Sequence, residues 1–324
     1  MPSKIEISYK TIIFTVFFLI LLWFLVQIID TIFLVFVAFI IMTAFKPWVD
    51  LLERIFLPRV LAIIIVYLGM FTLLGYTTSV LLPPLVSESI HLAEILPGYT
   101  REVLPFIQID PQIISQQLAP IGENVLKVTF GIFGNMIAVF SIFVISFYLL
   151  VQRKQLEPLL SEFVGEKGAI TLINTLRKVE GRLGSWVRGQ ATLMVFIGIT
   201  IFIGLTLLRV PFALPLSILA GILEIVPVIG PIFSAIPAVL VALTITPFLA
   251  VVTTMLYFTV QQVEAHLVIP FVMRKAVGIP PLITIISLMV GGKLGGIAGA
   301  ILAVPIVVTL ETVFSEYLKS KEAK

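Results

Sequence analysis

The chain contains no cysteine and only two histidines among its 324 residues. Without cysteine, disulfide bonds, thiol catalysis, zinc–thiolate sites and iron–sulfur clusters are excluded. His91 and His266 lie far apart in sequence and form no metal-binding motif, so no metal site is predicted. The Gly-x4-Gly-Lys-Ser/Thr motif of phosphate-binding loops is also absent, which argues against ATP-driven chemistry.

Charged side chains are scarce, at 12% of residues, whereas soluble domains carry about 25%. The chain is 59% hydrophobic and its mean hydropathy is +1.16. This composition predicts an all-α, polytopic integral membrane protein whose main partner is the lipid bilayer, with about eight membrane helices or half-helices. The net charge of +3 comes with no basic patch interleaved with aromatics, so no nucleic-acid partner is predicted.

Apolar and charged stretches divide the chain into five predicted regions. Residues 1–82 hold three membrane helices, at 11–29, at 31–45 with an extension toward 51, and at 61–82. The other regions are two short external amphipathic helices at 83–128, a fourth membrane helix at 129–151, a charged amphipathic helix at 152–188 lying along or under the membrane core, and a C-terminal core at 189–324.

The basic residues predict the orientation of the chain in the membrane. Of the 21 lysines and arginines, 17 fall in the N-terminus, the loop after the second helix, residues 152–188, Arg274-Lys275 and the C-terminal tail. The positive-inside rule places these segments in the cytoplasm and residues 83–128 outside. Both termini of a multi-pass protein of the cell membrane are therefore predicted to be cytoplasmic.

Two glycine- and proline-rich breaks interrupt the C-terminal core. They lie at residues 225–231 and 291–299, and predict helical hairpins over 211–246 and 279–316. The two stretches also resemble each other, which suggests an inverted repeat of the kind found in transporters. The matched positions are Pro215 with Pro281, Gly230 with Gly296, and Pro237 with Pro305.

Ionisable residues beside these breaks are the candidate site. An ionisable group at bilayer depth costs about 2.5–3.5 kcal/mol on insertion scales, so it marks a functional position facing protein or water. We predict that Glu224, Glu264 and Lys293 line one polar site between the hairpins, with Glu224 exchanging protons. Pro227, Gly230, Pro231 and Gln261 complete the predicted substrate or ion site, and the predicted hinge glycines are Gly291, Gly295, Gly296 and Gly299.

Structural interpretations of the same residues stay open. Glu224 can cap free backbone amides at the break, and Glu264 can serve inter-helix hydrogen bonding near the membrane interface. Gly291, Gly295 and Gly299 form a four-residue ladder, and small residues at this spacing also permit close helix packing.

Several motifs resemble the autoinducer-2 exporter family of prokaryotic transporters. The resemblance covers most of the chain and is strongest over residues 186–305. The segment Ala-Gly-Ile-Leu-Glu-Ile-Val-Pro-Val-Ile-Gly-Pro at 220–231 is the most recognisable. Further matching segments are Lys-Pro-Trp-Val at 46–49, Trp-Val-Arg-Gly-Gln at 186–190 and Gly-Gly-Lys-Leu-Gly-Gly-Ile-Ala-Gly at 291–299. The resemblance implies membrane transport; members are linked to autoinducer-2 export, others to sodium or lithium/proton antiport.

We therefore predict a secondary transporter that exports a small polar metabolite or signal and is coupled to H⁺ or Na⁺, with a Na⁺(Li⁺)/H⁺ antiporter as the alternative. Neither needs a cofactor, and a homo-oligomer stays open. An enzyme is disfavoured because no Ser/His pair, His-Glu metal motif or intramembrane aspartate pair is present. A scaffold or channel would not require charges beside broken helices.

Overall fold

The computed structural model describes residues 9–55, 57–79, 83, 136–227, 229–273 and 278–322. Within these ranges every regular element is helical, and five helices are long and apolar enough to cross a membrane, with three shorter apolar helices beside them. The predicted all-α, polytopic membrane fold is confirmed. The predicted external helices at 83–128 lie outside the described residues, apart from residue 83.

The N-terminal helices form a small packed unit. Helix α1 (Tyr9–Gln27) is followed after one residue by α2 (Ile29–Arg54), so the chain turns slightly before Asp30, which lies in the first turn of α2. Helix α2, the Arg59–Ser79 helix and α5 (Met136–Gln152) share a buried cluster that includes Met42, Ile63 and Leu150. Across it, the Tyr67 hydroxyl donates a hydrogen bond of 2.6 Å to Ser146 Oγ.

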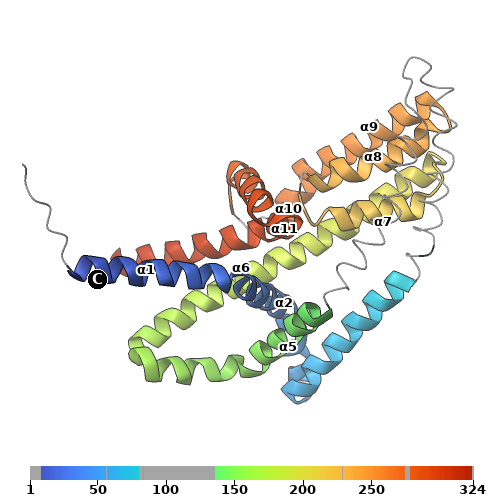
Figure 1. Cartoon of the computed structure of the whole chain (residues 1–324). Coiled ribbons are helices and arrows are strands. Elements are labelled where there is room, and N and C mark those ends of the chain that lie inside the picture. Colours follow the sequence, from blue (N-terminus) through green and yellow to red (C-terminus); the bar gives the residue numbers. More distant parts are fainter. Residues whose placement is uncertain are drawn as a thin grey trace, which may run out of the picture.

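A single long helix connects this unit to the rest of the molecule. After a short turn, η1 (Arg153–Gln155), helix α6 spans Leu156–Leu207 with one kink at Gly165, where φ is +73°. The predicted amphipathic helix and the predicted fifth membrane helix are therefore one continuous rod beyond Gly165, about 60 Å long at 1.5 Å per residue. Figure 1 shows this rod crossing the molecule diagonally. No proline occurs near Gly189 to end the helix there.

The first predicted hairpin is formed by α7 (Ala213–Leu223) and α8 (Ile229–Leu243), which contain 11 and 15 residues. Each is shorter than the roughly 20 residues that a helix needs to cross a bilayer. Together with α6 and α9 (Pro247–Val263), they enclose a core built from Ile201, Ala220 and Val241, among others. Figure 1 shows α7, α8 and α9 gathered around one end of α6.

The second predicted hairpin lies within α11 (Pro281–Glu322), whose backbone leaves helical geometry at Gly295 and Gly296. The chain thus breaks inside the predicted 291–299 segment. A Cβ atom on Gly299 would overlap the carbonyl oxygen of Gly291, so the two arms touch backbone to backbone. Gly291, Gly295 and Gly299 do not form a ladder on one helix face, because the break sends Gly291 and Gly299 to opposite arms.

The two hairpins meet at their breaks. Val226, from the first break, packs in one buried cluster with Leu288, Ala300 and Ala303 from the two arms of α11. The outgoing arm of α11 also packs against α2 and α6 through Val308 and its neighbours. The second arm of α11 is much longer than α8, so the two stretches share a hairpin form but not a length.

Candidate functional site

The first break puts Glu224 at the end of α7. Proline lacks a backbone N–H and restricts the residue before it, so Pro227 stops the helix within a turn. The last backbone bonds tighten accordingly, from Ile225 N–H to the Ile222 carbonyl (3.2 Å) and from Val226 N–H to the Leu223 carbonyl (3.1 Å). Residues 224–227 are non-helical and α8 begins at Ile229, so the break starts slightly earlier than the predicted 225–231.

Gly230 and Pro231 belong to the first turn of α8 rather than to the break. Proline is tolerated there because the N–H groups of a first helical turn have no partner within the helix. Gly230 is required for a different reason: a Cβ atom at this position would overlap the Leu223 carbonyl oxygen. The missing side chain lets the start of α8 fold directly against the end of α7.

Helix α6 supplies a polar partner for this turn. Gln190 is buried, and its Nε2 donates a hydrogen bond of 2.5 Å to the Glu224 carbonyl oxygen. Helix α7 can approach α6 because Gly221 packs beside Gly198, where a Cβ on Gly221 would lie 2.7 Å from the Met194 carbonyl oxygen. The turn is therefore fixed to α6 by packing and by one side-chain hydrogen bond.

A π-helical segment brings in Glu264. After α9 the chain forms η2 (Glu264–Val268) and then the short α10 (Ile269–Met273). The Ile269 N–H bonds the Glu264 carbonyl five residues earlier, the π pattern. Pro270 accounts for it, since its ring would clash with a carbonyl four residues back and it has no N–H to donate. Such segments often occur at functional sites.

Glu224 and Glu264 lie together in the interior. The two residues are 1% and 3% exposed, and their carboxyl groups are close enough to influence each other electrostatically. Met273 of α10 packs on Gly189, next to Gln190, which holds the π segment against α6. Two acidic side chains, buried side by side between a broken hairpin and a π segment, are the centre of the candidate site.

Further buried polar atoms extend this site. Within the described residues, Gln190 Oε1, Glu224 Oε2, Thr253 Oγ1 and Tyr257 Oη are buried without a hydrogen-bond partner. Thr253, Tyr257 and Glu264 are spaced so that all three fall on one face of α9 and its continuation. At 1.5 Å per residue, the Tyr257 and Thr253 positions lie about 10 and 16 Å along the helix from Glu264. Buried unpaired groups of this kind call for water, an ion or a ligand.

The remaining predicted site residues differ in their burial. Pro227 and Gln261 are half-buried, and Pro231 is buried in the first turn of α8. Lys293 is exposed near the Gly295–Gly296 break, and no ion pair joins it to Glu224 or Glu264 in the described chain. The structure therefore brings together Glu224 and Glu264, and the predicted role of Lys293 in the same site stays a prediction. His266 is exposed and bonds the Gln262 carbonyl oxygen through Nδ1.

The sequence interpretation missed Glu180, which is 4% exposed on α6. Its carboxylate accepts hydrogen bonds from Lys46 Nζ at 3.1 Å and from Arg153. These contacts connect α2, the end of α5 and α6. Its only sequence signal is its place next to Val179 on the apolar stripe of an otherwise charged segment. Among the described residues, no group of three or more histidine, aspartate and glutamate side chains gathers as a metal site.

Comparison with known proteins assigns nearly the whole chain to one family. Residues 12–319 match the family described as "AI-2E family transporter". The putative transport protein YueF of Bacillus subtilis is 27% identical over 302 residues, covering 86% of this chain and 82% of YueF. The putative transport protein YhhT of Escherichia coli K12 is 25% identical over 213 residues, 64% of this chain and 60% of YhhT. A putative transport protein of Mycobacterium tuberculosis, MT0215, is 43% identical over 105 residues, 32% of this chain and 29% of that protein.

Proposed function

Because the chain belongs to the AI-2E transporter family and is a multi-pass membrane protein, we propose that it is a secondary transporter whose coupling site is the buried pair Glu224 and Glu264. It moves a small polar metabolite or signal across the cell membrane, with both termini in the cytoplasm, and is not an enzyme. The observation that carries the proposal is the placement of two buried carboxyl groups side by side at a helix break.

The chemistry of the pair favours proton coupling. Two neighbouring carboxylates in an apolar setting repel each other, so the pair is more stable when at least one of them carries a proton. Binding of a cation, or of a cationic or hydrogen-bond-donating substrate, would release that proton. Uptake of a proton would in turn release the bound species. This exchange links movement of substrate in one direction to movement of protons in the other.

The surrounding oxygens support a second candidate, a Na⁺(Li⁺)/H⁺ antiporter. Gln190 Oε1 and Glu224 Oε2 are buried oxygens without partners in the described chain, and both adjoin the break. Carbonyls and carboxylates at helix breaks are the usual ligands of transported monovalent cations. In this version the cation itself displaces the proton, and no organic substrate is needed.

The two broken hairpins supply the moving parts in both versions. The α7–α8 hairpin is made of helices too short to cross a bilayer, and its break packs on the arms of α11. We infer that it enters the membrane without crossing it and that access alternates by movement of one hairpin against the other. Substrate or cation would then bind where the breaks meet.

A proteoliposome assay of the purified chain tests the proposal. An imposed pH gradient, acidic outside, is combined with Na⁺, Li⁺ or a panel of small polar metabolites inside. Accelerated efflux of a metabolite by the gradient identifies a coupled exporter, whereas Na⁺- or Li⁺-driven proton movement without any metabolite identifies the antiporter. If no solute responds to the gradient and no proton movement follows any cation, the coupling proposal is wrong.

A further inference from the structure

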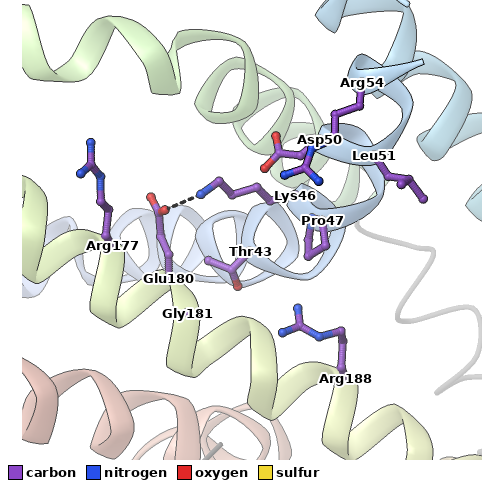
Figure 2. A pocket seen from close by; sticks show the side chains of 10 residues that line it. All are labelled: Thr43, Lys46, Pro47, Asp50, Leu51, Arg54, Arg177, Glu180, Gly181 and Arg188. Carbon is purple, nitrogen blue, oxygen red and sulfur yellow. Dashed lines mark hydrogen bonds and ion pairs between the residues drawn. The ribbon is translucent and has the colours of Figure 1, made fainter. Parts of the chain in front are cut away.

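A cavity of about 410 Å³ lies between α2 and α6, at the end of the bundle predicted to be cytoplasmic (Figure 2). Its charged lining consists of Lys46, Asp50, Arg54, Arg177, Glu180 and Arg188. Four cations therefore face two carboxylates. The volume falls in the range of small-molecule sites, about 300–1,000 Å³. Glu224 and Glu264 do not line it, so it is separate from the proposed transport site.

Both carboxylates of the cavity already have cationic partners. Glu180 is bonded by Lys46 and by Arg153, and the dashed line in Figure 2 marks the Lys46 contact. Asp50 pairs with Arg59 at 3.3 Å. Arg153 and Arg59 do not line the cavity, so cations from outside it contribute to balancing its negative charge, although Arg59 also pairs with Glu53 at 2.7 Å. The remaining cations of the lining are left in excess.

Two of these cations stand on opposite walls without an acidic partner in the described part of the chain. Arg188, from α6, donates to Ser185 Oγ at 3.2 Å, a neutral group. Arg54, from the end of α2, has no ion pair among the described residues. Figure 2 shows Arg188 extending from α6 toward α2, while the Arg54 side chain bends back along α2. Arg177, by contrast, pairs with the exposed Glu157.

Two glycines explain why space exists between these walls. At Gly184, a Cβ atom would lie 2.8 Å from the Thr43 carbonyl oxygen, so α2 and α6 touch there. At Gly181, a Cβ atom would meet nothing within 4 Å, so the helices have already separated one turn away. The absent side chain at Gly181 keeps the cavity open beside the unpaired arginines.

We propose that this cavity binds a phosphate-type anion through the guanidinium groups of Arg54 and Arg188, which both line it. Guanidinium groups match phosphate oxygens with paired hydrogen bonds, and such bonds are about twice as strong as neutral ones. A basic pocket between membrane helices on the cytoplasmic side is suited to an anionic lipid headgroup. A free phosphorylated solute offers the same oxygens. The proposal does not depend on the transport site, because no residue is shared.

The test uses the full chain, purified in a neutral detergent, with two probes. Inorganic phosphate is titrated at constant ionic strength and binding is measured by calorimetry. In a parallel arm, retention of phosphatidylglycerol against phosphatidylcholine is measured by native mass spectrometry. Saturable phosphate binding identifies a soluble anion site. Selective phosphatidylglycerol retention without phosphate binding identifies a lipid headgroup site.

Two variants and one control decide whether the cavity is responsible. Arg54→Gln with Arg188→Gln removes the proposed donors, and Gly181→Met narrows the cavity while keeping every charge. The arginine variant should weaken binding at least about tenfold, the effect of one lost charge-assisted hydrogen bond. Gly181→Met should weaken binding to a smaller degree, because it takes up part of the space. Lys167→Gln with Lys321→Gln removes two exposed positive charges elsewhere and should leave binding unchanged.

Unchanged melting temperatures show that the variants fold. No saturable binding in either arm, or equal weakening by the control, overturns the proposal. So does wild-type affinity in the protein with Arg54→Gln and Arg188→Gln, because both proposed guanidinium donors are absent from it.

Discussion

Glu224 and Glu264 reach each other through three local features of the backbone: the Pro227 break, the contact between Gly230 and Leu223, and the π segment before Pro270. None of these features supplies a countercharge. The Gln190 amide bonds the backbone carbonyl of Glu224 rather than its carboxyl group. The pair therefore depends on protons or bound ligands for its charge balance.

The Tyr257 hydroxyl offers a residue-level test of the polar face of α9. It is buried without a partner in the described chain. Tyr257→Phe should slow transport, because a polar atom on the route to Glu264 is lost. Thermal stability should stay level or rise slightly, since an unpaired buried hydroxyl contributes only its desolvation cost. Flux in proteoliposomes and the melting temperature in detergent provide the two readouts.

Tyr67→Phe is the matched control, because the Tyr67 hydroxyl is bonded to Ser146. It should cost about 0.5–1.5 kcal/mol of stability and leave flux unchanged. Wild-type flux in the Tyr257→Phe protein would show that the α9 face is not part of the route.

The acidic site residues could be predicted from the sequence, whereas their polar neighbours could not. Glu224 and Glu264 could be singled out because an ionisable side chain in an apolar membrane segment costs free energy. Such a residue is therefore expected to have a function. Gln190, Thr253 and Tyr257 are common side chains in membrane helices, and only the packing shows that they are buried. Lys293 has the same sequence signal as the two glutamates but is exposed, so an isolated charge alone does not reveal which way its helix faces.

At the scale of elements, the α11 hairpin depends on one backbone contact. Gly299→Ala would place a methyl group against the Gly291 carbonyl oxygen, so the two arms would have to separate. We expect a loss of about 1–3 kcal/mol, the usual cost of overpacking a tight contact. Gly292→Ala is the control, because its Cβ would sit 4.0 Å from the nearest atom, Ala300 Cβ.

Thermal unfolding of the two purified variants in detergent measures the difference. Equal melting temperatures for Gly299→Ala and Gly292→Ala would contradict the back-to-back arrangement of the arms.

The predicted helix breaks agree with the structure where proline or glycine residues interrupt the helix locally. Composition alone did not reveal where a helix continues. Pro227 and the Gly295–Gly296 pair mark real breaks within or beside the predicted segments. The charged and apolar stretches on either side of Gly189 belong to one helix, because a change from charged to apolar composition does not by itself end a helix. Such a change indicates only that the environment of the side chains differs along one continuous helix, here α6.

At the scale of the whole molecule, Glu180 connects the N-terminal unit to the C-terminal core. Glu180→Gln would leave Lys46 and Arg153 without a counter-ion. Removing one partner of a buried ion pair typically costs about 3–5 kcal/mol, and we expect the lower end because glutamine still accepts hydrogen bonds. The melting temperature should fall clearly.

Glu157→Gln is the control, because it breaks the exposed pair with Arg177 and should cost at most about 1 kcal/mol of stability. Similar small shifts for both variants would show that Glu180 does not hold the two units together.

The central claim is that Glu224 and Glu264 couple transport to protons, and one measurement tests it most directly. Flux is recorded in proteoliposomes over a series of imposed pH gradients for the wild type, Glu224→Gln, Glu264→Gln and the exposed control Glu162→Gln. Glutamine keeps the size of the side chain but cannot exchange a proton. We predict that both pair variants fold and insert but lose the response of flux to the gradient, whereas Glu162→Gln keeps it. A wild-type response to pH in both Glu224→Gln and Glu264→Gln would contradict the account.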